Sequence, residues 1–234
     1  MSPDELHDGH RAVSGGLARA AIFGVNDGIV SNVSLILGFA GSGADSSVVL
    51  LAGLAGAVAG GISMAAGEWI SISAQNELIE REVAVEWREL HRNAEAETAE
   101  LASMYEGHGI SPTTARSAAE DVMAQPETAL VVHAREEMGI DPSDPPSAFK
   151  AAAISLLCFL FGAMLPVIPW FGDVSGIAPA AISVTIGVIA AAFVGAAIGV
   201  FAERSIPKSI IRQVAIVLIA CSITNAIGEF VGVS

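Results

Sequence analysis

Glutamates recur at helical spacing in a stretch, residues 68–106, that contains neither glycine nor proline. On a helix each residue advances about 100° around the axis. Apolar residues such as Val83, Leu90 and Leu101 lie beside these glutamates, and basic residues lie opposite. Carboxylates on an inward-looking face repel one another and lose solvation, which a bound cation offsets. Five glutamates and one methionine, here called the acidic stripe, share about a quarter of the helix surface: Glu82, Glu86, Glu89, Glu97, Glu100 and Met104.

A later segment offers matching donors. His133 and Glu137 are four residues apart and so share one face of a predicted helix, with Glu136 near its edge. Carboxylates with one imidazole and one thioether suit Fe²⁺ or Mn²⁺, with Zn²⁺ and Co²⁺ as further candidates. No DxDxDG-type calcium loop is present. The alternative is a solvated acidic face that binds nothing. The predicted ligands are Glu86, Glu89, Glu97, Glu100, His133, Glu136 and Glu137, with Glu82 and Met104 as additional candidates.

The composition indicates what kind of body carries these groups. The chain has 234 residues, of which 53% are hydrophobic and 15% charged, and its mean hydropathy is +0.60. Soluble domains carry about a quarter charged residues. Residues 76–146 hold 16 of the 25 acidic residues. This asymmetry predicts a lipid-embedded body with one polar insertion, and the net charge of −14 argues against nucleic acid as a partner.

Apolar runs of about 20 residues can cross ~30 Å of hydrocarbon. We expect an all-α integral membrane protein with five transmembrane helices and a three-helix cytoplasmic domain between the second and third. The second helix continues into the acidic stripe, and shorter helices follow over 113–123 and 126–139. The expected domains are 1–75, with a tail and two spans, 76–147, which binds metal, and 148–234, with three spans. The five runs are 20–41, 47–72, 148–170, 178–201 and 209–231.

The basic residues predict the orientation in the membrane. All 11 lysines and arginines fall in or beside segments 1–19, 73–147 and 202–208, and the loops on the other side contain none. Basic residues are enriched in cytoplasmic segments. The N-terminus and residues 76–147 are therefore expected in the cytoplasm and the C-terminus outside.

Three polar or polarisable residues in the apolar runs predict an ion path. Asp27 lies within the first run, where a carboxylate costs several kcal/mol and usually lines a pathway. Met64 and Glu68, four residues apart in the second run, face the same way, and a thioether can contact a partly dehydrated transition metal. The alternative for Asp27 is a carboxylate that packs helices together.

No Ser/His/Asp, Cys/His or nucleotide-binding arrangement predicts an enzyme, and the ExxH spacing of di-iron bundles is missing. The two cysteines, Cys158 and Cys221, lie in apolar runs and are expected to be small core residues. We expect no tightly bound cofactor.

Several short motifs follow one another between residue 24 and the last run: Asp27-Gly28, Gly60-Gly-Ile-Ser-Met64, Gly67-Glu68, the ExxE pairs Glu86/Glu89 and Glu97/Glu100, and Leu165-Pro-Val-Ile-Pro169. With this set of motifs the chain resembles the vacuolar iron transporter family. The resemblance implies a proton-coupled exporter that moves Fe²⁺, and often Mn²⁺, out of the cytoplasm as a homodimer, with the ion path at the dimer interface. By this similarity Asp27 and Met64 line the path, and the ExxE glutamates and Glu137 bind metal.

Two positions depart from the plant-like pattern. Gly56 stands where those members carry a path-lining Glu, and His133 where they carry Met. The first removes a proton-coupling group, for which Glu68 is a candidate substitute, and the second favours harder or borderline ions. We expect a bacterial-type protein of the plasma membrane. The alternative function is a membrane-tethered metal sensor or buffer, which leaves Asp27 unexplained.

Overall fold

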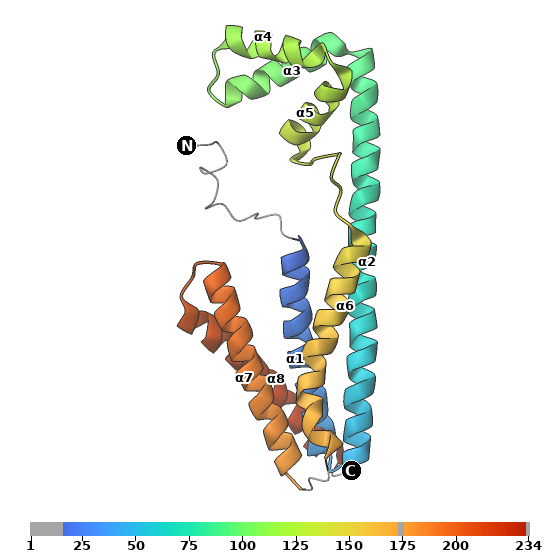
Figure 1. Ribbon diagram of the computed structural model, residues 1–234, viewed down its shortest axis with the longest axis vertical. Coiled ribbons are helices and arrows are strands. Elements are labelled where there is room, and N and C mark those ends of the chain that lie inside the picture. The colour runs from blue at the N-terminus through green and yellow to red at the C-terminus, as the bar shows by residue number, and fades with distance from the viewer. Residues whose placement is uncertain (1–15, 173–175, 233–234) are drawn as a thin grey trace. The chain divides into compact units, whose positions relative to one another are not determined.

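The computed structural model describes residues 16–172 and 176–232, and over these residues the chain is all-helical (Figure 1). Arg11 is one of the 11 basic residues used above to predict the orientation in the membrane, and it lies outside the described residues. Five helical segments of the described part are long and apolar enough to cross a membrane, as predicted. They are α1 (Gly16–Gly41), α2 (Ser46–Arg92), α6 (Ala148–Met164) with the 3₁₀ helix η2 (Leu165–Phe171), α7 (Ala178–Phe201) and α8 (Ile206–Gly232).

The chain forms two compact units, described here one at a time. The first, the membrane unit, runs up to Trp69 and resumes at Ala148. The second, the polar unit, is Ile70–Ser147. Helix α2 contributes its first part to the membrane unit and its last part to the polar unit.

Helix α1 lies at the centre of the membrane unit, in contact with α6, α7, α8 and η2. The α1–α6 contact is backbone to backbone, because a Cβ on Gly28 would overlap the carbonyl oxygen of Phe159. Helix α6 ends at Met164, where Pro166 and Pro169 remove the amide donors that an α-helix needs, and the chain tightens into η2.

A row of small residues on α7 packs against the neighbouring helices. Gly187, Ala191, Gly195 and Gly199 recur at every fourth position and are all buried. A Cβ on Gly195 would lie 2.8 Å from Cα of Ile210, so the backbones of α7 and α8 approach closely there. Small residues at this spacing permit such approach within a membrane.

The polar unit contains the end of α2 and three shorter helices: α3 (Ala94–Gly107), α4 (Pro112–Met123) and α5 (Pro126–Met138). The Ser111 side chain caps α4, and Gly139 ends α5 at φ 65°, a left-handed conformation that glycine adopts without strain. Leu101 and Ala102 of α3 pack against Ala119 of α4.

The acidic stripe does not lie on one continuous helix. Helix α2 ends at Arg92 and α3 begins at Ala94, with Asn93 between them at φ −129° and ψ 34°. Basic residues in the last turn of α2 and acidic residues in the first turn of α3 favour the two new helix ends. Glu86 and Glu97 therefore come from different helices rather than from one helix face.

Candidate metal centre and ion path

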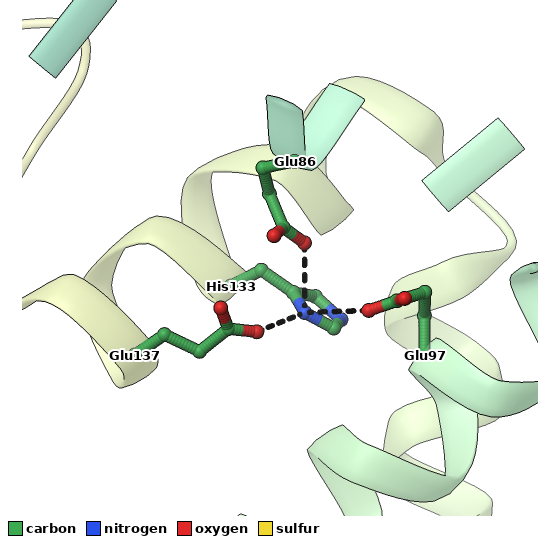
Figure 2. Close-up of side chains that lie close together, drawn as sticks. All are labelled: Glu86, Glu97, His133 and Glu137. Carbon is green, nitrogen blue, oxygen red and sulfur yellow. Dashed lines mark hydrogen bonds and ion pairs between the residues drawn. The ribbon is translucent and has the colours of Figure 1, made fainter. Parts of the chain in front are cut away.

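Four side chains from three helices converge in the polar unit, and we call them the four-ligand cluster: Glu86 of α2, Glu97 of α3, and His133 and Glu137 of α5 (Figure 2). Each offers one ligand atom, and these atoms all lie within 4.8 Å of one another. The Nδ1 atom of His133 is 3.0 Å from Oε1 of Glu137, 3.1 Å from Oε1 of Glu86 and 3.9 Å from Oε2 of Glu97.

Three of the four side chains are buried, and the His133 ring offers few hydrogen-bond donors to the carboxylates around it. His133 is 0% exposed, Glu86 4% and Glu97 7%, while Glu137 is partly exposed. A single Nδ1–H can serve only one of the three surrounding carboxylates well, and Glu137 accepts that bond. Among the described residues, Oε1 of Glu86 and Nε2 of His133 are buried without a hydrogen-bond partner. A divalent cation would contact all three carboxylates at once, which a proton does not.

The electrostatics agree with this geometry. Burial, followed by the charge of Glu137, raises the pKa of Glu86 from 4.5 to about 7. Burial, followed by the charge of Glu100, raises the pKa of Glu97. Both carboxyls are therefore held toward the protonated form by the same loss of solvation and mutual repulsion that a metal ion would relieve.

The other predicted ligands lie outside the four-ligand cluster. Glu89 and Glu100 are exposed. Glu82 is half-buried and pairs with Arg81 at 2.8 Å. Glu136 lies 3.8 Å from Nδ1 of His108, and Met104 is half-buried.

A groove of about 260 Å³ in the membrane unit brings two of the predicted path residues together. The Asp27 carboxylate accepts a hydrogen bond of 3.1 Å from the Ser31 hydroxyl one turn later. The third, Glu68, does not line the groove and instead forms an ion pair with Arg19 at 3.0 Å. The lining residues are Asp27, Ser31, Asn32, Leu35, Gly56, Gly60, Ser63, Met64 and Phe159.

Sequence reasoning missed three polar residues of this groove, Ser31, Asn32 and Ser63. The signal for Ser31 was its position four residues after Asp27, on the same face of α1. Asn32 offered only its polarity within an apolar run, and nothing in its spacing indicated that it would be buried.

Comparisons with known proteins cover both units. A sequence model of the VIT family matches residues 18–229. Vacuolar iron transporter 1 of Eucalyptus grandis is 30% identical over 217 residues, which span 92% of this chain and 87% of that protein. The vacuolar iron transporter of Acanthamoeba castellanii is 33% identical over 198 residues, which span 80% of this chain and 72% of that protein. Vacuolar iron transporter 1 of Arabidopsis thaliana is 30% identical over 164 residues, which span 70% of this chain and 66% of that protein.

Proposed function

Because the chain belongs to the VIT family, whose relatives above are named as iron transporters, we propose that it carries divalent transition metals across a membrane. The proposed main substrate is Fe²⁺, and Mn²⁺ is the proposed second substrate. This membership also makes the chain a transporter-family protein and not an enzyme, as the sequence predicted.

The observation that carries the proposal is the groove that Asp27 and Met64 share. It lies on helices long and apolar enough to span a membrane, where a carboxylate is costly unless it serves an ion pathway. The carboxylate offers charge and the thioether offers a soft ligand, a combination that suits a partly dehydrated transition-metal ion.

The four-ligand cluster supports a role in collecting metal before transport. Glu86 binds a proton near neutral pH, because its pKa is about 7, so metal and protons compete for this carboxylate. We propose that the polar unit faces the cytoplasm and that the transporter exports metal in exchange for protons. In this proposal the Asp27 carboxylate binds the metal ion and the proton in turn.

The exposure of the groove supports a homodimer. Asp27 is exposed and Met64 is half-buried on the single chain. An exposed carboxylate on a membrane-crossing helix is unfavourable in lipid, and a second copy over the groove would enclose it. The proposed location is the plasma membrane with the C-terminus outside, whereas the relatives compared above are named for the vacuole.

The test is metal flux in proteoliposomes that contain the full chain and an internal pH dye. The native protein is expected to move Fe²⁺ with opposite proton movement. Asp27→Asn is expected to abolish flux, because the neutral amide neither balances the charge of the cation nor carries an exchangeable acidic proton. Asp45→Asn is the matched control, since Asp45 is an exposed aspartate beside the start of α2 and does not line the groove.

The double substitution Glu86→Ala/Glu97→Ala tests the collecting role. Flux at low metal concentration should weaken, while flux at saturating metal should persist through Asp27. Metal binding without flux in the native chain would instead favour the membrane-tethered sensor or buffer. Native flux that Asp27→Asn leaves unchanged would contradict the proposed path.

A further inference from the structure

Asn32 ties together three helices around the groove. It lies in α1 and is 2% exposed. Its Nδ2 atom donates hydrogen bonds to the carbonyl oxygens of Gly53 in α2, at 3.1 Å, and of Ala163 in α6, at 2.6 Å. The two bonds use both N–H groups of the amide. They also determine which way the amide faces, because the reverse orientation would press Oδ1 against two carbonyl oxygens.

The other end of this amide is unused. Oδ1 of Asn32 is buried and has no hydrogen-bond partner among the residues that the structure describes. Gly56, another groove residue, lies beside it: a Cβ added to Gly56 would be 2.9 Å from Oδ1. An unpaired buried carbonyl oxygen is unfavourable, and the helix-bridging bonds of Nδ2 do not account for it. The oxygen therefore points to a ligand from the groove.

We propose that Oδ1 of Asn32 is an oxygen ligand for the divalent cation in the groove, in addition to Asp27 and Met64. This inference rests on the proposed transport function and deepens it. Asn32 follows Asp27 by five residues, about 7.5 Å along the helix axis. The amide oxygen suits Mn²⁺ and Fe²⁺, and because it is neutral it adds coordination without holding the ion as tightly as a second carboxylate would.

The competing explanation is that Asn32 only holds the helices together. A bridging role predicts that substitution lowers stability and slows all cations alike. A ligand role predicts that the apparent affinity falls and that the order of preferred metals changes. The two readouts that separate these roles are KM in proteoliposome flux and the ratio of Mn²⁺ flux to Zn²⁺ flux.

The first variants are Asn32→Leu, which keeps the shape and removes the polar atoms, and Asn32→Cys. Gln213→Leu is the matched control: Gln213 is a buried amide of α8, also with an unpaired oxygen, and does not line the groove. We expect Asn32→Leu to raise KM for Mn²⁺ by about 10- to 100-fold, the range typical of lost metal-site contacts. Asn32→Cys should lower the Mn²⁺/Zn²⁺ ratio about tenfold, since thiolates favour Zn²⁺.

Gly56→Ala keeps the test decisive if the Asn32 variants fail to fold. The added methyl would lie 2.9 Å from Oδ1 and 2.4 Å from Cδ2 of Leu35, so it covers Oδ1, while the end of the Leu35 side chain moves aside and the Asn32 amide shifts slightly. Alanine also favours the helix over glycine. We expect a folded protein with a raised KM for Mn²⁺ and a lowered Mn²⁺/Zn²⁺ ratio. Simple narrowing of the groove would slow both metals equally and would contradict the proposal.

The outcomes separate this inference from the proposed function. A native chain that moves no metal overturns both. The ligand role alone is overturned by a different result, in which the native chain moves metal and Asn32→Leu and Gln213→Leu are equally impaired. In that result the Mn²⁺/Zn²⁺ ratio is also unchanged in Asn32→Cys and Gly56→Ala. A raised KM and a shifted ratio only in the variants that remove or cover Oδ1 support it.

Discussion

Glu86→Gln should stabilise the metal-free polar unit and weaken metal binding at the same time. The pKa of Glu86 is raised from 4.5 to about 7 by burial and by the charge of Glu137. A shift of this size corresponds to roughly 3 kcal/mol against the ionised form. Because the pKa is raised, the protonated carboxyl contributes stability that is fully present below pH 4.5 and is lost as the pH rises through about 7.

Two measurements on the full chain in detergent check this prediction. Hydrogen exchange in α3 and α5, corrected for the intrinsic pH dependence of amide exchange, gives the free energy of local opening. The metal-free variant should exceed the native protein by up to ~3 kcal/mol at pH 8, with the gap closing toward pH 5. Calorimetric titration with Mn²⁺ should show native affinity rising roughly tenfold from pH 6 to pH 8 as Glu86 ionises, and a shallower rise in the variant.

Glu89→Gln is the matched control, because Glu89 belongs to the same ExxE pair but is exposed and outside the four-ligand cluster. Its effects on the free energy of local opening and on the rise of Mn²⁺ affinity with pH should both be much smaller than those of Glu86→Gln. The reasoning would be refuted if Mn²⁺ affinity rose equally with pH in the native protein and in Glu86→Gln. A Glu86→Gln variant that is less stable than the native protein at pH 8 without metal would also refute it.

Three further substitutions test the packing that positions the two sites. Gly28→Ala should destabilise the membrane unit by about 1–3 kcal/mol in thermal unfolding, because the new methyl overlaps the backbone of α6, whereas Gly67→Ala, with no atom near its Cβ, should not. Gly139→Ala should cost about 1–2 kcal/mol by placing alanine at φ 65°, seen as faster hydrogen exchange at the end of α5. Ser183→Ala removes the acceptor 2.9 Å from Nε1 of Trp170, and the tryptophan fluorescence should shift as the melting temperature falls.

The membrane spans were predictable because their signals are local. A run of about 20 apolar residues must form a helix in lipid whatever its neighbours do, and the five observed segments agree with the five predicted runs. The short helix α5 was likewise marked by Pro126 at its start and by Gly139 at its end. The four-residue spacing of small residues on α7 is a local signal of the same kind, and Gly195 has no space for a side chain on that side.

The ligand set was less predictable because it depends on tertiary contacts. A helical projection places Glu86, Glu89, Glu97 and Glu100 together and has no means to separate them. In the structure Glu86 and Glu97 are buried beside His133, whereas Glu89 and Glu100 are exposed. The orphan oxygen of Asn32 depends on carbonyls 21 and 131 residues away in the chain, so no local pattern could reveal it.

The break at Asn93 is what makes a single metal centre geometrically feasible. On one straight helix Glu86 and Glu97, eleven residues apart, would be separated by about 16 Å along the axis. No single cation could contact both carboxylates across that distance, so a continuous acidic stripe could only bind ions one carboxylate pair at a time. With α2 ending at Arg92 and α3 starting at Ala94, the ligand atoms of both carboxylates fall within the 4.8 Å that the four-ligand cluster spans. A metal ion bound there would contact α2, α3 and α5 together, so its binding should slow hydrogen exchange at the ends of all three helices in the polar unit.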